Sequence, residues 1–373
     1  MTTNRIILAA GGTGGHIIPA LTVSTELKNR GFDCKLLSDK RGLRLIENIS
    51  PKQKVSNIFA SSPLTGNMVQ RFIAIFILCF GVIQSMFHII CFRPFCVVGF
   101  GGYPSAPPLI AANFFGLPSL LHEQNARVGR ANLFLARGVN AMLLSWKNSK
   151  PVPSNIPVLT TGLPVRTIFF DLPDYKRKSK FSVKSPCNIL IIGGSLGAQI
   201  FAELIPLAIS ALPDKIQKSL IITQQVRKEQ LSELKDTYSK MSIKHICSSF
   251  FTEMPYEMAK ADIIISRAGA ASVAEIAAIG RAAVIIPFSG SLDQHQICNA
   301  RSLTSEKAAI LLLEEEIKAD SSILTKNLLS LIENPKKCQI LATRVRELAY
   351  RNALNDIIGS ITSYQDLKNG GVK

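Results

Sequence analysis

Residues 5–16 read RIILAAGGTGGH, an apolar run followed by a glycine-rich turn that ends in a histidine. Residues 188–198, NILIIGGSLGA, have the same layout. An apolar strand, a glycine turn and a helix start form the opening of a Rossmann-type unit. Two such openings in one chain therefore predict two Rossmann-like halves.

The remaining apolar runs alternate with helical patterns, which predicts an α/β fold with parallel sheets. The expected strands are Ile6–Ala10, Cys34–Ser38, Cys96–Phe100, Ser119–His122, Ala141–Ser145, Asn188–Ile192, Ser219–Thr223, Ile243–Ile246, Ile263–Ser266 and Ala283–Pro287. The expected helices include Pro19–Asn29, Gln199–Leu212 and Ser272–Ile279. The segment Pro151–Pro186 is rich in Pro, Lys and Ser and is expected to be a linker with exposed surface.

Charge and composition narrow the class of partner. The chain has 373 residues, 43 basic and 26 acidic side chains, and a net charge of +17. Such a balance predicts an anionic partner. No basic run is interleaved with stacking aromatics, so nucleic acid is not expected. The eight cysteines form no CxxC pair, and we expect them to be buried thiols in a reducing cytoplasm. The N-terminal apolar run is too short for a signal peptide.

His16 ends the first glycine turn, at the carboxyl end of the first predicted strand. Ligands bind at that edge in open α/β sheets, and an imidazole suits a general base. The alternative is a histidine that only caps the turn. The glycines favour a phosphate or, alternatively, a tight strand–helix turn, and their spacing is not the GxGxxG of dinucleotide enzymes.

A second candidate site is SRAGAASVAEIA, which begins at Ser266 directly after a predicted strand. Small residues let a diphosphate approach the helix N-terminus, and Glu275 could then hold ribose hydroxyls. The alternative is a packed helix start with a solvated carboxylate. Downstream, the polar groups of DQHQ at 293–296 follow another strand end, and they could equally form an ordinary loop.

Two further loops follow strand ends in the first half. In HEQN, residues 122–125, the amides can bind a sugar, whereas Glu123 could be a base or a structural acid. GFGGYPS, residues 99–105, supplies another glycine loop. Together with GGTGGH, these loops predict a wide opening at the strand ends of the first half, lined by backbone groups.

The segment Phe72–Phe92 is 21 residues long with three clear polar groups, Gln84, Ser85 and His88. Its length permits a membrane span. A span is rejected because Cys96–Phe100 is needed in the same sheet as Ile6–Ala10. Two interpretations remain: a buried crossover helix, or a helix with one face buried and the other in the lipid interface. The positive charge supports the second interpretation.

The motifs GGTGGH, GFGGYPS, HEQN, GLPVR, GGSLGA, SRAGAASVAEIAAIG, DQHQ and NAR occur in this order from about residue 5 to about 350. In combination the chain resembles the MurG family, peripheral membrane N-acetylglucosaminyltransferases of peptidoglycan synthesis. The resemblance implies a GT-B fold, in which two Rossmann-like domains with parallel sheets face each other across a cleft. It implies an N-terminal acceptor and membrane-facing domain over 1–164 and a donor domain over 165–349. A C-terminal helix at about 350–368 is expected to pack back on the first domain.

The resemblance also implies the reaction. GlcNAc passes from UDP-GlcNAc to the 4-hydroxyl of undecaprenyl-diphospho-MurNAc-pentapeptide (lipid I), with inversion, to give lipid II. No cofactor and no metal are expected, because no DxD-like motif is present. The expected partners are UDP-GlcNAc, lipid I, an anionic membrane surface and other cell-wall synthesis proteins. The expected location is the cytoplasmic face of the bacterial inner membrane.

By the same resemblance His16 is the general base, and Gly102, Tyr103 and Glu123 lie on the acceptor side. Glu275 is expected to hold ribose, and Phe251 to lie against uracil. Donor binding is expected from Thr13, Gly14, Gly15, Asn125, Arg166, Ser195, Phe251, Ala270, Ala271, Ser272, Val273, Ala274, Glu275, His295 and Gln296. Leu163 stands where the family has Asn in GNPVR, which puts the contact of Arg166 in doubt.

Three rival functions remain. A related GT-B enzyme could use another UDP-sugar or another lipid acceptor, such as a diacylglycerol. A nicotinamide-dependent dehydrogenase would need GxGxxG and an acid about 20 residues later, which neither glycine loop supplies. A non-catalytic membrane scaffold for cell-wall enzymes would tolerate the loss of His16.

Overall fold

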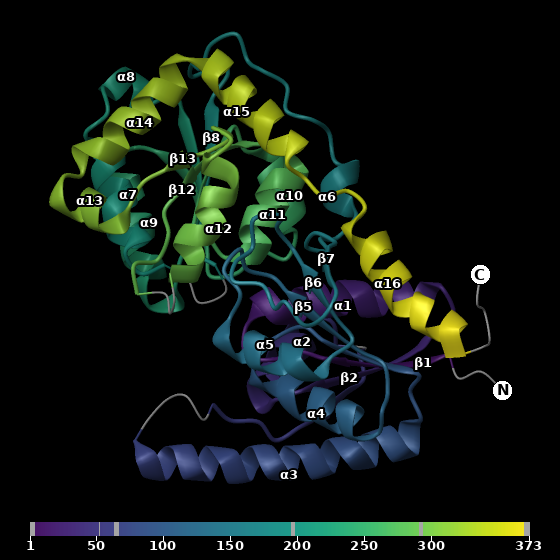
Figure 1. The fold of residues 1–373 in the computed structure, drawn as a ribbon. Helices are drawn as coiled ribbons and strands as arrows, with labels where there is room; N and C mark the ends of the chain where they lie inside the picture. The colour runs from purple at the N-terminus through teal and green to yellow at the C-terminus, as the bar shows by residue number, and fades with distance from the viewer. Residues whose placement is uncertain (1–3, 52, 63–66, 195–197, 291–293, 369–373) are drawn as a thin grey trace. The chain divides into compact units, whose positions relative to one another are not determined.

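The chain forms two compact units in the computed structural model, which describes residues 4–51, 53–62, 67–194, 198–290 and 294–368 (Figure 1). Unit 1 comprises Met1–Val165 together with Tyr350–Lys373, and unit 2 comprises Arg166–Ala349. The α/β class predicted from the sequence is confirmed in both units.

Unit 1 contains a parallel seven-stranded sheet in the order β3-β2-β1-β4-β5-β6-β7. Its strands are β1 Arg5–Ala9, β2 Asp33–Ser38, β3 Val55–Asn57, β4 Cys96–Gly99, β5 Ser119–Glu123, β6 Ala141–Leu144 and β7 Val158–Thr160. Its helices are α1 Gly14–Asn29, α2 Lys40–Ile49, α3 Met68–Phe92, α4 Ala106–Phe114, α5 Arg130–Leu135 and α16 Ala353–Lys368, with 3-10 turns η1 Tyr103–Ser105 and η2 Ala136–Gly138. Strand β1 pairs with both β2 and β4, so it lies inside the sheet.

Alternate residues of β1 enter two different cores, as expected for a sheet covered on both faces. Ile6 and Leu8 pack with residues of α1 and with Ile357 of α16. Ile7 and Ala9 pack in the other core, which includes residues of α3, α4 and α5. The C-terminal helix therefore helps to close one face of the first sheet.

Helix α3 begins at an Asn67 capping box, in which Asn67 and Gln70 exchange side-chain to backbone hydrogen bonds. Its buried residues, Ala74, Gly81, Ser85 and Ile89, recur at helical spacing and form one narrow face. Figure 1 shows α3 lying along α4, which it contacts. A side chain at Gly81 would collide with the Phe59 carbonyl oxygen, so a glycine is needed where α3 passes the Phe59 backbone.

The interpretation of this segment as a buried crossover helix is wrong, because most of α3 is exposed. Its exposed large apolar side chains are Met68, Val69, Phe72, Ile73, Ile75, Phe76, Phe80, Ile83, Phe87 and Ile90. Within the described part of the chain, α3 is the helix long and apolar enough to cross a membrane. Strand β4 nevertheless pairs in parallel with β1, which is the pairing on which the rejection of a span depends. The observed helix has one buried and one exposed face.

Unit 2 contains a parallel six-stranded sheet in the order β10-β9-β8-β11-β12-β13. Its strands are β8 Cys187–Ile192, β9 Leu220–Gln225, β10 Lys244–Ser248, β11 Ile263–Ser266, β12 Ala282–Ile285 and β13 Ile310–Leu311. Its helices are α6 Ile168–Asp171, α7 Phe201–Ser210, α8 Asp214–Gln217, α9 Leu231–Lys240, α10 Met254–Lys260, α11 Ala270–Ile279, α12 His295–Thr304, α13 Glu314–Ala319, α14 Ser322–Glu333 and α15 Pro335–Glu347, with the 3-10 turn η3 Lys228–Gln230. Strands β3, β7 and β13, which have two or three residues each, were not predicted from the sequence.

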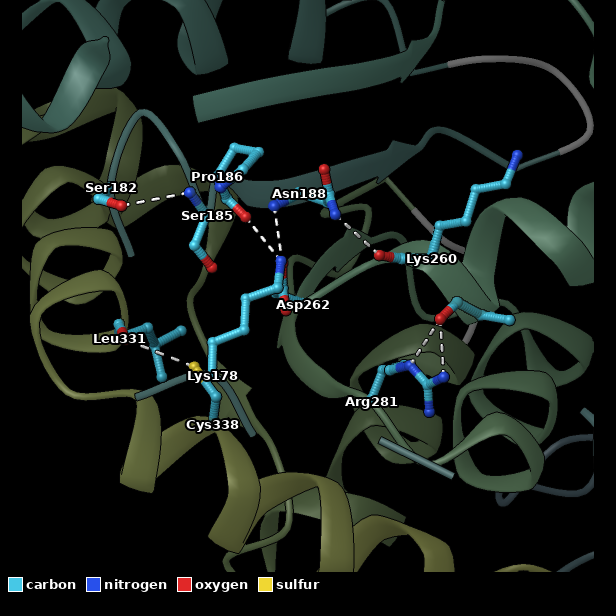
Figure 2. A network of polar contacts seen from close by, with 11 residues as sticks. Lys178, Ser182, Ser185, Pro186, Asn188, Lys260, Asp262, Arg281, Leu331 and Cys338 are labelled. Atoms are coloured by element: carbon cyan, nitrogen blue, oxygen red, sulfur yellow. Dashed lines mark hydrogen bonds and ion pairs between the residues drawn. The ribbon is translucent and has the colours of Figure 1, made fainter. Parts of the chain in front are cut away.

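The boundary between the two units lies after Val165, inside the segment Pro151–Pro186 that was expected to be a linker with exposed surface, but parts of this segment also belong to the two units. Strand β7 pairs with β6, and Phe181 is buried in the core of unit 2. Lys178 donates to Asp262 Oδ2 at 2.7 Å and to the Pro186 carbonyl oxygen at 2.6 Å, as Figure 2 shows. Asp262 is 2% exposed, so an ion pair with the linker balances a buried charge.

The chain leaves unit 1 after Val165 and returns at Tyr350. Near the exit, Gly162 has φ +81°, and a Cβ there would lie 2.5 Å from the Tyr350 Cβ. The exit and return segments of unit 1 are therefore packed against each other at a position that only glycine can occupy without strain.

The cysteines differ from expectation in one respect. Cys79 and Cys91 are exposed on α3, and Cys298 is partly exposed. The other five, Cys34, Cys96, Cys187, Cys247 and Cys338, are buried. The exposed pair follows from the mostly unburied surface of α3.

Candidate active site

The three polar loops of unit 1 leave the same edge of the sheet. GGTGGH follows β1, GFGGYPS follows β4 and HEQN follows β5, and these strands are neighbours in the sheet order. Parallel strands bring their carboxyl ends together. The structure thus gathers the three motifs that the sequence analysis singled out in the first half.

Close backbone packing holds the first two loops together. A Cβ at Gly102 would lie 2.7 Å from the Gly11 carbonyl oxygen, and one at Gly11 would collide with Pro104. The Ser105 Oγ lies 2.8 Å from both the Ala9 and the Gly101 carbonyl oxygens. Glycines are needed here because the Pro104 ring and the Gly11 carbonyl group leave no room for a side chain.

His16 lies in the first turn of α1, and its ring is oriented by the loop that precedes it. Its Nδ1 lies 3.1 Å from the Gly11 carbonyl oxygen and 3.4 Å from the Thr13 Oγ1. A carbonyl oxygen only accepts, so Nδ1 carries the proton and donates it to Gly11. The neutral ring then has its lone pair on Nε2, which is the atom that a general base needs.

Asp39 also supports this loop, and the sequence analysis missed it. Its Oδ1 accepts from Gly42 N at 2.9 Å as the N-cap of α2, and from Gly12 N at 3.4 Å. The signal was available, because an aspartate directly after a strand is a typical N-cap.

Glu123 organises the HEQN loop. It is 1% exposed. Its Oε1 accepts from Asn125 N at 2.9 Å and Asn125 Nδ2 at 3.1 Å. Its Oε2 accepts from Gly129 N at 3.0 Å and Asn132 Nδ2 at 2.7 Å. Four donors satisfy a buried carboxylate, which matches the structural acid of the two roles left open. The acceptor-side role of Glu123, Gly102 and Tyr103 stays a prediction.

In unit 2, α11 begins at Ala270 after the cap residue Gly269, for which the described residues provide no side-chain cap. The first backbone N–H groups of a helix have no intrahelical partner. Ala270, Ala271 and Ser272 therefore present N–H groups at the positive end of a ten-residue helix. This arrangement can hold a phosphate.

Gln296 and Asn299 of α12 join the α11 loop to the loop after β12. The Gln296 Oε1 accepts from Ala268 N at 3.2 Å and from Phe288 N at 2.9 Å. The Asn299 Nδ2 donates to the Ala268 carbonyl oxygen at 3.1 Å. Both bonds of Gln296 use its amide oxygen, so its amide nitrogen is the group that could contact a nucleotide-sugar substrate.

The buried Arg267 is a second residue that the sequence analysis did not assign, although it lies within SRAG. Its Nη1 is 2.7 Å from Glu314 Oε2 and donates to the carbonyl oxygens of Ile286 and Pro287 at 3.1 and 3.0 Å. Its guanidinium also lies over the Phe201 ring, 4.7 Å from the centroid. Arg267 thus connects the loop after β11 to the loop after β12 and to the first residue of α13.

Glu275 follows on α11 and is partly exposed. Burial raises the pKa of its carboxyl to about 7, and the opposing charge of Arg166 lowers it by less. Arg166 itself is exposed, with its guanidinium 5.2 Å from the centre of the Phe169 ring. The structure therefore brings Arg166 and Glu275 within electrostatic reach, and their part in donor binding stays a prediction.

The remaining predicted donor residues belong to several elements of both units. Val273 is buried inside unit 2, whereas Ala274 is partly exposed. Phe251 is half-buried after β10, and His295 is the first residue of α12. Thr13, Gly14, Gly15 and Asn125 belong to unit 1. Ser195 lies outside the described residues.

Possible metal ligands do not form a cluster among the residues that the structure describes. No group of three or more His, Cys, Asp or Glu side chains that could hold an ion occurs there. Helix N-terminal N–H groups and arginines are the groups that the two sites offer to a negative charge.

Comparison with known proteins agrees with this architecture. Residues 6–144 match the glycosyltransferase family 28 N-terminal domain, and residues 188–357 match the glycosyltransferase family 28 C-terminal domain. The fold and its loops are therefore those of a family 28 glycosyltransferase.

Proteins that match nearly the whole chain identify a more specific family within the family 28 glycosyltransferases. A UDP-N-acetylglucosamine–N-acetylmuramyl-(pentapeptide) pyrophosphoryl-undecaprenol N-acetylglucosamine transferase of Bradyrhizobium diazoefficiens is 36% identical, over 92% of this chain and 94% of its own. The crystal structure of Acinetobacter baumannii MurG superposes with a TM-score of 0.75 at 28% identity, over 96% of this chain and 99% of its own. The chain belongs to the MurG family. A UDP-GlcNAc 2-epimerase of Neisseria meningitidis, 14% identical with a TM-score of 0.65 over 96% of this chain and all of its own, shares the fold alone.

Proposed function

We propose that this enzyme transfers GlcNAc from UDP-GlcNAc to the 4-hydroxyl of undecaprenyl-diphospho-MurNAc-pentapeptide, giving lipid II. The observation that carries the proposal is the His16 ring, whose Nδ1 donates to the Gly11 carbonyl oxygen and leaves Nε2 as a base. The names of the relatives, which are transferases of this substrate pair, support it.

The acceptor step belongs to unit 1. The His16 Nε2 takes the proton of the attacking hydroxyl, and the hydroxyl oxygen bonds to C1 of the sugar. The bond from C1 to the UDP oxygen breaks on the opposite side, so the anomeric carbon is inverted. A positive charge develops on the sugar ring in such a step, as in other glycosyl chemistry.

The donor is held by unit 2 in this proposal. The N–H groups of Ala270, Ala271 and Ser272 donate hydrogen bonds to the leaving diphosphate and stabilise the negative charge that grows on it. The Glu275 carboxylate accepts hydrogen bonds from the ribose hydroxyls, and Arg166 adds positive charge near it. Phe251, His295 and Gln296 of the same unit also contact the donor in this proposal.

Isothermal titration with UDP-GlcNAc, UDP-GalNAc and UDP-glucose, with and without magnesium, tests the donor. Preferential binding of UDP-GlcNAc without metal is expected, followed by turnover of lipid I. The rival enzyme, a transferase for another UDP-sugar, would show a preference for that sugar. The His16→Ala variant should bind UDP-GlcNAc like the wild-type enzyme and lose turnover; full turnover in this variant would exclude His16 as the base.

We further propose that the exposed face of α3 rests in an anionic membrane surface at the cytoplasmic face of the bacterial inner membrane. Its exposed phenylalanines and isoleucines favour the lipid interface, and the net charge of +17 favours anionic headgroups. Flotation with liposomes should show binding that increases with anionic lipid and falls with salt. Binding insensitive to both would contradict the electrostatic part of the proposal.

A further inference from the structure

An exposed aromatic ring that the proposed mechanism does not use lies at the edge of the second sheet. Phe288 follows β12 at its carboxyl end and is 45% exposed. Strand β12 pairs in parallel with β11, and β11 leads into the loop that starts α11. The carboxyl ends of neighbouring parallel strands meet at one edge of a sheet. Phe288 and the N-terminus of α11 therefore share this edge, within unit 2.

The backbone of Phe288 is joined to the loop before α11 through one atom. The Gln296 Oε1 accepts from Phe288 N at 2.9 Å and from Ala268 N at 3.2 Å. Two N–H groups that bond to the same oxygen lie close together in space. The ring therefore projects from a point beside the helix N-terminus that can hold a phosphate, and the Gln296 amide nitrogen lies next to it.

Two neighbours hold the ring of Phe288 in place. The Arg267 guanidinium lies over the ring, 5.5 Å from its centroid. A Cβ at Gly290 would lie 2.8 Å from Phe288 Cζ and 3.0 Å from Cε1, so the ring packs closely against this glycine. A side chain held in one orientation loses little conformational freedom when a ligand covers it. The exposed surface of Phe288 is therefore preorganised.

The order of the strands places this ring on one particular side of the donor. In the proposed donor site Phe251, after β10, contacts uracil, and α11, after β11, holds the diphosphate. The sheet order is β10-β9-β8-β11-β12-β13, so β11 lies between β10 and β12. In a sugar nucleotide the diphosphate joins the nucleoside to the sugar. A donor with its base on the β10 side therefore has its sugar on the β12 side, where Phe288 lies.

The groups around Phe288 match the chemistry of a hexose. The Gln296 amide nitrogen can donate to a sugar hydroxyl. A hexose also carries apolar C–H groups, which gain free energy when an apolar surface covers them. Ligand sites combine such apolar surfaces with a few polar groups that fix orientation. Phe288 supplies the apolar surface here, and Gln296 supplies the polar group.

We propose that the Phe288 ring packs against the C–H groups of the donor sugar, so that the enzyme binds the sugar nucleotide more tightly than UDP alone. This inference rests on the proposed function, which sets the direction of the donor along the sheet edge. The contact involves the sugar and neither the base nor the diphosphate. Removing the ring should therefore weaken binding at one end of the donor.

The test compares UDP-GlcNAc with UDP by calorimetric titration of the full-length enzyme. Phe288→Ala should bind UDP-GlcNAc about fivefold more weakly and UDP within twofold of the wild type. In turnover assays the KM for UDP-GlcNAc should rise by a similar factor, with kcat and the KM for lipid I nearly unchanged. Equal weakening of UDP and UDP-GlcNAc, or unchanged binding of both, would overturn the inference.

Further variants separate a sugar contact from a structural role. Gly290→Ala keeps Phe288 but displaces its ring, so UDP-GlcNAc binding should weaken while UDP binding is retained. Phe288→Tyr keeps the ring and should restore the wild-type ratio of the two affinities. Ile340→Ala is the matched control, because Ile340 is 42% exposed on α15 of the same unit, and it should leave both affinities unchanged. If Phe288→Ala does not fold, Phe288→Leu removes the planar ring and should change the ratio in the same direction.

Two other outcomes distinguish this inference from the proposed function. A wild-type enzyme that prefers UDP-GalNAc or UDP-glucose would refute only the proposed donor, and Phe288→Ala should then weaken that sugar nucleotide relative to UDP. A variant with a raised KM for lipid I and intact UDP-GlcNAc affinity would place the ring against the acceptor. That result would overturn the inference and leave the proposed reaction standing.

Discussion

Glu275→Gln should make the enzyme more stable and less able to hold its donor. The carboxyl has its pKa raised from 4.5 to about 7 by burial, so its ionised form is disfavoured in the folded state. One pKa unit corresponds to about 1.4 kcal/mol, so the full shift corresponds to about 3 kcal/mol. Glu275 is partly exposed, and solvent screening reduces the expected gain to about 1–2 kcal/mol.

The sign of the pH dependence follows from linkage. Below pH 4.5 the carboxyl is protonated in both folded and unfolded chains and costs nothing. As the pH rises toward 7, the unfolded chain ionises first, so the folded state loses stability; above pH 7 the cost is complete. Glu275→Gln should therefore raise the unfolding temperature of unit 2 at pH 8 and change it little at pH 4.5.

Donor binding should change in the opposite direction. Charge-assisted hydrogen bonds contribute about 1.5–3 kcal/mol each, so UDP should bind roughly ten- to a hundredfold more weakly to the glutamine variant. In the wild type UDP affinity should rise as the pH passes through about 7, and in the variant this dependence should be lost. Calorimetric unfolding and UDP titration between pH 5 and 8 measure both effects.

Glu257→Gln is the matched control, because Glu257 forms a helical ion pair with Lys260 at 2.8 Å on the surface of α10. It should change stability by no more than about 0.5 kcal/mol and leave UDP affinity intact. If Glu275→Gln behaved like this control at every pH, the assignment of Glu275 to ribose and the burial argument would both fail.

Three further perturbations test other parts of the structure. Gly162→Ala places a Cβ 2.5 Å from the Tyr350 Cβ at φ +81°, and urea unfolding should show a loss of about 1–3 kcal/mol; an unchanged midpoint would refute the close packing there. Arg267→Met removes the buried partner of the 5%-exposed Glu314 and leaves this carboxylate paired with Lys318 alone, at 2.7 Å, so unit 2 should lose about 1–3 kcal/mol at neutral pH, and an unchanged midpoint of urea unfolding would refute a stabilising role of the Arg267 ion pair. Phe76→Ser removes a side chain that is 74% exposed on α3, so vesicle affinity should fall by roughly tenfold or more while melting temperature is retained; equal binding would exclude this face of the helix from the membrane contact.

The local patterns were sufficient for most of the secondary structure. Ile6–Ala10 was predicted as a strand and β1 is Arg5–Ala9, because a continuous apolar run next to a glycine turn suits a strand covered on both faces. The edge strands β3, β7 and β13 were missed because two or three residues carry no periodicity. Their pairing depends on neighbours that are distant in sequence.

The sequence by itself determined the two Rossmann-type openings, the loop motifs and the family, since glycine turns and helix starts are encoded by adjacent residues. The tertiary structure alone decided that α3 is exposed along most of its surface, that the linker residue Phe181 is buried, and that Glu123 is fully bonded. The tertiary structure also decided which nitrogen of His122 carries the proton, because the Gly162 carbonyl oxygen, 40 residues away, accepts from its Nε2. The orientation of the Gln124 amide depends on this proton, because the Gln124 amide nitrogen faces His122 Nδ1. Proton positions and burial depend on which distant groups meet in the folded chain, and no local pattern records them.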